Sequence, residues 1–262
     1  MTIGISVGIE LLDATEGLHS MSEAKQKPGF WSPENLKSLF FLILLVLCFR
    51  WSIASPYHVP TASMEPTIKV GDRLLAFKLS YGLKIPFTDI SVIEWGKPGH
   101  GDIIVFRYPK EPQIDYVKRV VGLPGDKIRV EDNSIYINGE LQVRKDHNFD
   151  RSILGDIADD ANRRDLFKEN LRGLDHWVMQ ATPGPYALFQ SRFPSDGEFV
   201  VPDDSFFVMG DNRDNSTDSR SWGVVPKEYV RGKALFVIWS MYSQESESLP
   251  SFRFKRFGHW LI

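Results

Sequence analysis

The sequence predicts a mostly β fold that follows one membrane-spanning helix. One long apolar stretch lies at residues 36–53, and from residue 56 onward short apolar runs rich in β-branched residues alternate with Gly, Pro and Asp. Such alternation is typical of strands joined by turns. Asn138-Gly139, directly after an apolar run, adds the signal of a type I′ hairpin, because both turn positions need positive φ.

The apolar stretch is uninterrupted only at residues 39–49, which is too short to cross about 30 Å of hydrocarbon. If Lys37 and Arg50 extend toward opposite interfaces and Trp51 lies among the headgroups, the span reaches nearly the required length. We therefore expect one transmembrane helix at residues 37–55.

Three other interpretations of this stretch stay open. A buried core helix has a similar composition, but the rest of the chain has little helical pattern to pack against it. A cleavable signal peptide fits the small residues Ser52 and Ala54, although the segment ahead of the apolar run is much longer than a usual charged n-region. A helix lying on the membrane surface is the third. We favour the anchor.

Residues 1–36 form the expected cytoplasmic segment. The lysines before the span favour a cytoplasmic N-terminus; they are Lys25, Lys27 and Lys37. Residues 1–20 contain acidic side chains but no Lys or Arg, whereas the sequence from Met21 resembles an ordinary cytoplasmic leader. Translation could therefore start at either Met1 or Met21.

After the helix, strands are expected at residues 73–79, 102–108, 116–121, 127–130, 134–137, 199–201, 206–209 and 234–240. Residues 143–198 differ, because they are polar and helix-tolerant and contain no chemical motif. We interpret them as an insertion into a β domain formed by residues 56–142 and 199–262.

Composition excludes several classes of function. The net charge of -3 comes from many interspersed acids and bases, so we expect no nucleic acid partner. Cys48 is the only cysteine and the six histidines show no paired spacing, which argues against a disulfide and against a metal site. We expect no metal and no cofactor.

The first block with chemical potential is VPTASMEPT at residues 59–67, immediately after the apolar stretch. Ser63 lies between Pro60 and Pro66, which restrict the backbone and could hold its hydroxyl in one orientation. A simple surface turn explains the same residues.

The second block is YVKRVVGLPGD at residues 116–126. Strand alternation directs Lys118 and Arg119 to opposite faces, so one of them should point inward. A lysine on an apolar face loses hydration, which lowers its pKa and supplies a neutral amine that can take a proton from serine. The alternative is a solvated strand from which both cations extend into water.

The third block is GDNRDNSTDSRSWG at residues 210–223. Its density of turn-forming residues also fits a plain surface loop. A loop this polar between apolar runs can nevertheless supply an ion pair, Asp218 with Arg220, and the Ser216 hydroxyl beside a reaction centre.

Together these blocks resemble the bacterial type I signal peptidase family, also called leader peptidase. Residues 63–67 match the family's SMxPT box, residues 118–126 its KRVxGxPGD box, and residues 210–223 its GDNRxxSxDSRxWG box. Gly101-Asp102 before a strand is a fourth match, and all four occur in the family's order.

The resemblance implies an antiparallel β catalytic domain related to the self-cleaving repressor fold, with a smaller inserted β-rich domain. Ser63 would be the nucleophile and Lys118 its general base. The Thr61 hydroxyl and the Ser63 N–H would hold the oxyanion, and Ser216 would orient Lys118. Structural support would come from Asp211, Asp218, Arg220 and Arg119.

The family usually has Ser-Gly-Ser where this chain has Thr61-Ala62-Ser63. The added methyl groups reduce the room in the oxyanion site. Because threonine retains the donor, we expect activity to survive.

The implied partners are secreted precursors whose signal peptides end in small residues at positions -1 and -3, together with the phospholipid membrane. The implied location is the bacterial inner membrane, crossed once, with the catalytic domain on the periplasmic side. The C-terminal tail SFRFKRFGHWLI could lie at the headgroups, or could be an edge strand or a disordered end.

Two other function classes remain open. A self-cleaving repressor-like protease would need a DNA-binding helix pair at the place of the apolar run. A catalytically silent, membrane-anchored binding module would not need Ser63 and Lys118 to be intact. A penicillin-interacting Ser-x-x-Lys enzyme is excluded at Ser63, because Pro66 occupies the lysine position.

Overall fold

The computed structural model describes residues 31–85, 88, 90–131, 134–146, 151–154, 157, 164–181, 193–194, 197–242 and 251–261. Contacts divide the chain into two compact units, Met1–Leu47 and Cys48–Ile262. Residues 1–30, which contain both possible start sites, lie outside the described part of the chain.

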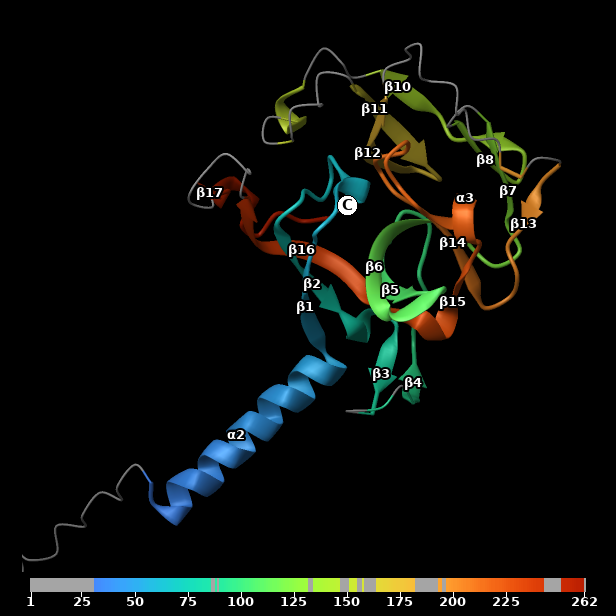
Figure 1. Ribbon diagram of the computed structural model, residues 1–262. Coiled ribbons are helices and arrows are strands. Elements are labelled where there is room, and N and C mark those ends of the chain that lie inside the picture. The colour runs from blue at the N-terminus through green and yellow to red at the C-terminus, as the bar shows by residue number, and fades with distance from the viewer. Residues whose placement is uncertain are drawn as a thin grey trace, which may run out of the picture. The chain divides into compact units, whose positions relative to one another are not determined.

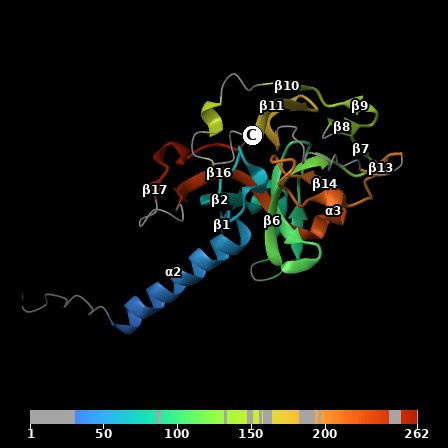
Figure 2. The same ribbon diagram turned by 45° about the horizontal axis from the view of Figure 1, so that its top comes forward.

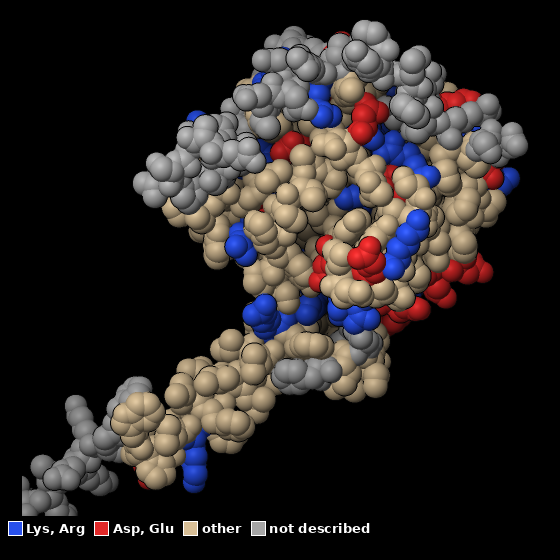
Figure 3. Space-filling view, viewed as in Figure 1, with Lys and Arg blue, Asp and Glu red and all other residues tan. Residues whose placement is uncertain are grey.

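Helix α2, Pro33–Ser52, is 20 residues long. A proline suits the first helical position, where no backbone donor is needed. At 1.5 Å per residue the helix is about 30 Å long. Its apolar side chains are exposed, and Figure 3 shows few charged groups along it. Among the described residues it alone is long and apolar enough to cross a membrane.

The expected bounds 37–55 of this helix are wrong at both ends. The helix begins earlier because Ser32 accepts a hydrogen bond from the Asn35 N–H at 3.3 Å, which favours a helix start at Pro33. It ends at Ser52 because Ala54 and Ser55 pair with the next strand instead.

The second unit is built on one large antiparallel sheet (Figures 1 and 2). Its strands occur in the order β1-β2-β16-β5-β6-β14-β15, and β17 pairs with β16. Their bounds are β1 Ala54–His58, β2 Asp72–Phe77, β5 Ile103–Tyr108, β6 Glu111–Gly122, β14 Ser205–Met209, β15 Val225–Pro226, β16 Val230–Tyr242 and β17 Ser251–Phe252. The predicted mostly β, antiparallel fold is thus confirmed.

Smaller sheets flank the large one. One has the order β13-β7-β8-β9, another β10-β11-β12, and β3 pairs with β4 alone. The bounds are β3 Gly82–Lys84, β4 Ser91–Glu94, β7 Lys127–Glu131, β8 Ser134–Ile137, β9 Glu140–Leu141, β10 Arg144–Asp146, β11 Arg164–Leu171, β12 Leu174–Ala181 and β13 Phe199–Val200. The short helix α3 covers Ser219–Trp222.

Two hairpins use the same turn chemistry. Asn138 and Gly139, between β8 and β9, have φ of 53° and 81°, which confirms the predicted turn. Arg172 and Gly173, between β11 and β12, have φ of 51° and 94°. The helix-tolerant interpretation of this stretch is therefore wrong, because residues 164–181 form a hairpin.

The C-terminal residues lie along the large sheet. Ser251 and Phe252 pair with β16, which confirms the edge-strand interpretation at those residues. Arg256 is buried and makes an ion pair with Asp72, which fastens the tail to β2. Phe254 and Trp260 remain exposed. Contact of the tail with a membrane stays a prediction.

Candidate active site

Ser63 lies on a single turn of 3₁₀ helix, Ala62–Met64, that follows β1. Next to it Met64 and Ile68 are fully buried in the core shared with β2, β5 and β16. The Ser63 carbonyl accepts a hydrogen bond from the Asn212 N–H at 3.2 Å, and the Ala62 carbonyl accepts one from the Asn212 side chain at 3.1 Å. Core packing on one side and Asn212 on the other thus hold the serine turn in place.

Lys118 lies in β6 with its amine in contact with the serine. Its Nζ donates to Ser63 Oγ at 2.6 Å and to the Val117 carbonyl at 3.0 Å, and the side chain is 3% exposed. Burial lowers the pKa of Lys118 to about 8, against the opposing charges of Asp218 and Asp211. A substantial neutral fraction is therefore present near neutral pH.

Arg119 points to the other face of β6, as strand alternation predicts. Its guanidinium pairs with Asp211 and donates to the Gly101 carbonyl at 2.8 Å. Both neighbouring cations are buried, so the alternative of a solvated strand is excluded. The first block joins this pair, because Thr67 donates a hydrogen bond of 2.6 Å to the Asp211 carboxylate.

Asp218 and Arg220 brace the loop of residues 210–223. The Asp218 carboxylate accepts from Arg220 Nε and Nη2 at 2.8 Å each, and from the Gly210 N–H at 3.0 Å. Burial alone would raise the pKa of Asp218, but the Arg220 guanidinium holds it below its ordinary value. Arg220 also donates to the Arg213 carbonyl at 2.6 Å, which closes the loop on itself.

Ser216 lies in the same loop, but it does not bond to Lys118 in this geometry. Its buried hydroxyl interacts instead with the Asp218 carboxylate and helps to lower the pKa of that group. The hydroxyl packs against Gly210, where an added Cβ would overlap both Ser216 Oγ and the Ser63 carbonyl oxygen. Glycine is therefore required at this position for the loop to approach the serine turn.

Thr61 places a second hydroxyl beside that of Ser63. Its Oγ1 lies 3.5 Å from Ser63 Oγ, so the side chain named from the resemblance is adjacent to the serine. The described residues contain no cluster of His, Cys, Asp and Glu that could hold a metal ion.

An open cleft of about 370 Å³ reaches these residues. Its walls come from the end of β1, from β2 and β5 and from the middle of β6, and Ser63 and Lys118 are among its lining residues. Apolar side chains dominate the walls; they include Tyr57, Val59, Leu74, Val105, Ile114 and Val117. Within the described ranges no strand pairs with the outer edge of β1, and an edge strand can pair with an extended chain.

The sequence alone did not indicate a further buried ion pair that supports the loop. Glu169 in β11 accepts two hydrogen bonds from the Arg213 guanidinium, at 2.9 and 2.5 Å, and all of these groups are buried. The Met179 N–H also donates to the Asp211 carbonyl at 2.8 Å. Arg213 was visible in the third block, but no local signal pointed to a partner so distant in the chain.

An antiparallel β domain that places a serine hydroxyl against a buried lysine amine, at an open cleft, has the layout of a serine peptidase. Comparison with known proteins agrees with that class. The model of the family described as signal peptidase, peptidase S26, matches residues 33–239. The chain belongs to this family and is a serine endopeptidase.

Two relatives from Pseudomonas support the assignment. A signal peptidase I of Pseudomonas fluorescens is 39% identical over 228 residues, which cover 82% of this chain and 75% of the relative. The signal peptidase I of Pseudomonas aeruginosa is 37% identical over 227 residues, with the same coverage of 82% and 75%. The crystal structure of a signal peptidase I from Enterococcus faecalis shares 26% identity, covering 53% of this chain and 97% of that one, with a TM-score of 0.31.

Proposed function

We propose that this chain removes N-terminal signal peptides from secreted precursor proteins, with Ser63 as the nucleophile and Lys118 as the general base. The 2.6 Å contact between Lys118 Nζ and Ser63 Oγ carries the proposal, because it joins a buried amine of lowered pKa to a hydroxyl at the cleft. Membership of the signal peptidase family supplies the substrate class.

In the first step the neutral Lys118 amine takes the hydroxyl proton while Ser63 Oγ attacks the scissile carbonyl carbon. The carbonyl oxygen becomes an oxyanion, which the Ser63 N–H and the Thr61 hydroxyl stabilise. The Lys118 ammonium then gives its proton to the leaving amine as the C–N bond breaks, leaving an ester on Ser63. A water molecule hydrolyses this ester, with Lys118 again accepting the proton.

In our proposal Ser216 and the charged side chains of the loop support the pair of Ser63 and Lys118. The Ser216 hydroxyl, which interacts with Asp218, orients the Lys118 amine once a substrate fills the cleft, because a hydroxyl can donate to the carboxylate and accept from the amine at the same time. Asp211, Asp218 and Arg220 keep the loop in position and touch no reacting atom.

Cleavage of a precursor with an Ala-x-Ala site by the full chain, in detergent or lipid, tests the mechanism. Ser63→Ala and Lys118→Ala should each lose at least about two orders of magnitude in rate. Lys110→Ala and Ser221→Ala, both at exposed positions, are the controls for the loss of any lysine or serine. Both variants should retain the wild-type rate.

Two results would contradict the proposal. A near-normal rate for Lys118→Ala would place the base elsewhere. An inert wild type that is well folded would favour the catalytically silent binding module.

We propose that the enzyme cleaves after small residues at positions -1 and -3. The support is the cleft of about 370 Å³ with apolar walls, which lies beside the edge strand β1, where an extended peptide can pair by main-chain hydrogen bonds. Precursors with Phe at -1 or Asp at -3 should be cut at least about tenfold more slowly than Ala-x-Ala, because a bulky or charged group would be buried without room or partner.

We propose that α2 anchors the chain in the bacterial inner membrane, with a cytoplasmic N-terminus and the catalytic domain in the periplasm. The exposed apolar helix of about 30 Å supports the anchor. External protease added to spheroplasts should digest the domain while a cytoplasmic marker stays intact. Protection of the domain from the protease would mean that it lies in the cytoplasm, which contradicts the proposed orientation.

We further propose the division into a catalytic domain of residues 56–142 and 199–262 with an inserted domain at 143–198. A small apolar cluster within the insert supports this; it contains Leu154, Leu166 and Met179, with Ile153, Ile157 and Trp177 packed against it. Leu171 packs instead with the cluster of β7 and β8, so the insert shares part of its core with the larger domain.

A further inference from the structure

Asn212 connects the serine turn to the insert. It is 1% exposed, and its backbone N–H donates to the Ser63 carbonyl at 3.2 Å. Its side chain bonds on both sides: Nδ2 donates to the Ala62 carbonyl at 3.1 Å, and Oδ1 accepts from Arg164 Nη1 at 3.1 Å. Arg164 is the first residue of β11. Consecutive hydrogen bonds therefore lead from the insert to the peptide group before the nucleophile.

These partners determine which way the Asn212 amide points. A guanidinium can only donate hydrogen bonds, and a carbonyl can only accept them. The side-chain oxygen must therefore face Arg164 and the side-chain nitrogen must face Ala62, because the reverse orientation would set donor against donor and acceptor against acceptor. The contact with Arg164 thus selects the orientation in which Asn212 can hold the serine turn.

The Ala62 carbonyl and the Ser63 N–H belong to one planar peptide group. Because this peptide bond is trans, the two groups point in opposite directions, and holding the carbonyl sets the direction of the N–H. The Glu65 N–H donates to the same carbonyl at 3.1 Å and closes the 3₁₀ turn. Asn212 supplies a second donor from outside the turn, so rotation of the peptide group would break both bonds.

The insert hairpin is fastened to the segment that carries Asn212. Met179 in β12 donates to the Asp211 carbonyl and accepts from the Arg213 N–H, each at 2.8 Å. Asn212 lies between these two partners of Met179. The hairpin therefore holds Arg164 in place relative to Asn212, and a strand positions a side chain more precisely than a loop does.

We propose that Asn212, oriented by Arg164 of the insert, is a positioning residue that holds the Ser63 N–H toward the oxyanion. This inference rests on the proposed roles of Ser63 as nucleophile and oxyanion donor. Asn212 acts through the peptide group before Ser63 and contacts no substrate atom. A donor whose direction is set in advance stabilises the oxyanion without reorganisation during the reaction. The insert thus takes part in catalysis from outside the cleft.

Two substitutions of Asn212 test the positioning. Asn212→Asp keeps the shape of the side chain but sets a carboxylate oxygen against the Ala62 carbonyl, and Asn212→Ala removes the contact. With the full chain in detergent and an Ala-x-Ala precursor, both variants should lower kcat at least about tenfold and leave KM within about twofold, because the alignment matters only once the oxyanion forms. An unchanged kcat, or a raised KM alone, would overturn the proposal.

A boronic acid analogue of the Ala-x-Ala peptide separates positioning from a purely structural role. It forms a tetrahedral adduct with Ser63 in which one oxygen takes the place of the oxyanion. Asn212→Ala should weaken binding of this analogue at least about tenfold, whereas binding of the uncleaved peptide, measured in a Ser63→Ala background, should change by less than about twofold. Equal weakening of both ligands would mean that Asn212 only supports the cleft, and would contradict the proposal.

Substitutions of Arg164 test the link to the insert. Arg164→Leu should lower kcat about fivefold, and Arg164→Lys, which keeps a donor, should restore part of the rate. In the Asn212→Ala background Arg164→Leu should cause no further loss, because it acts through Asn212. Independent losses that multiply in the double variant would exclude this path.

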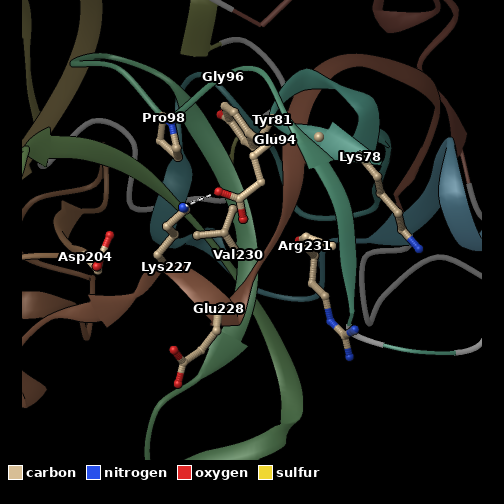
Figure 4. Close-up of a pocket in the computed structure, with 12 residues that line it drawn as sticks. Lys78, Tyr81, Glu94, Gly96, Pro98, Asp204, Lys227, Glu228, Val230 and Arg231 are labelled. Carbon is tan, nitrogen blue, oxygen red and sulfur yellow. Dashed lines mark hydrogen bonds and ion pairs between the residues drawn. The ribbon is translucent and has the colours of Figure 1, made fainter. Parts of the chain in front are cut away.

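Glu94→Gln is the control for Arg164→Leu. Glu94 in β4 makes an ion pair with Lys227, another contact between segments far apart in the chain, drawn as the dashed line in Figure 4. The pair borders a cavity of about 300 Å³ which, among the described residues, shares no lining residue with the cleft at Ser63. Glu94→Gln should therefore retain the wild-type kcat.

Ser63→Ala distinguishes failure of this inference from failure of the proposed function. If Ser63→Ala is inactive and the Asn212 variants keep the wild-type kcat, only the positioning role is overturned. If Ser63→Ala remains active, the proposed function fails and the positioning role fails with it.

Discussion

The Arg119 guanidinium donates hydrogen bonds of 2.8 Å to both carboxylate oxygens of Asp211, with both side chains almost completely buried. Burial alone would raise the pKa of Asp211, but the charge of Arg119 holds it below its ordinary value. Because Thr67 bonds to the same carboxylate, this pair joins the serine block, the lysine strand and the polar loop.

Asp211→Asn should destabilise the protein strongly, because it leaves the Arg119 charge buried without a counterion. Removal of one partner of a buried pair costs about 3–5 kcal/mol in the free energy of unfolding. Denaturant unfolding in detergent measures this. Asp175→Asn, at an exposed carboxylate, should leave the same quantity nearly unchanged. Equal effects of the two substitutions would contradict the structural role of Asp211.

The rate of cleavage should rise with pH as Lys118 loses its proton. Burial lowers the pKa of Lys118 to about 8, and only the neutral amine can accept the serine proton. We therefore expect kcat/KM to increase tenfold per pH unit below about pH 8 and to level off above it. A profile that is flat from about pH 6 to 8 would exclude Lys118 as the base.

Thr61→Val should slow catalysis by about 10²–10³-fold, because it removes the hydroxyl beside Ser63 and keeps the shape of the side chain. Thr61→Ser, which retains the donor, is the matched control and should keep a rate close to that of the wild type. The value of KM should change little in both variants, since the lost bond forms to the oxyanion. If both variants kept the wild-type rate, the second oxyanion donor would lie elsewhere.

Gly210→Ala should reduce activity by at least about tenfold, because the added methyl group overlaps the Ser63 carbonyl and the Ser216 hydroxyl and displaces the loop from the serine turn. Gly99→Ala is a suitable control, since nothing lies within 4 Å of a Cβ there. Peptide cleavage by the two purified variants compares them. Wild-type activity of Gly210→Ala would show that the loop and the serine turn move independently.

Thermal stability should fall as the pH drops from about 6.5 to 4, partly because of His176. Burial lowers the pKa of this histidine from 6.5 in the unfolded chain to about 4 in the fold. Between these values the unfolded state binds more protons, so acid favours unfolding. His176→Gln should weaken this pH dependence in scanning calorimetry of the detergent-solubilised chain.

His176 does not stand alone in this region. It faces Glu169 at 3.4 Å, with Arg213, Arg119 and Asp211 also acting on its charge. The carboxylates there keep lowered pKa values through their arginine partners and titrate mainly at lower pH. An unchanged pH dependence in His176→Gln would assign the acid sensitivity to other groups.

Much of the main sheet was predictable because its strands are short apolar runs, rich in β-branched and aromatic residues, that are bounded by turn residues. Every predicted strand overlaps an observed one, and the Asn138-Gly139 turn has the expected conformation. The blocks around Ser63 and Lys118 were likewise visible, and the structure brings the two side chains into contact.

The hairpin of β11 and β12 was missed for a physical reason. β11 buries Glu169 among apolar residues such as Leu166 and Leu171, so its sequence lacks the apolar alternation of an ordinary half-buried strand. The carboxylate can be buried there only because Arg213 from a distant loop neutralises it. Interactions of this range leave no local signature in the sequence.

The alternation of Lys118 and Arg119 along β6 carries a consequence for folding. A slip of β6 by one residue against its neighbours would turn Arg119 toward Ser63. Asp211 would then face the strand without its arginine partner. Such a misaligned chain would lack the proton acceptor and would also bury a carboxylate without its counterion. A chain with the inactive alignment is therefore less stable than one with the active alignment. The Arg119–Asp211 ion pair thus favours the active alignment when the catalytic domain folds.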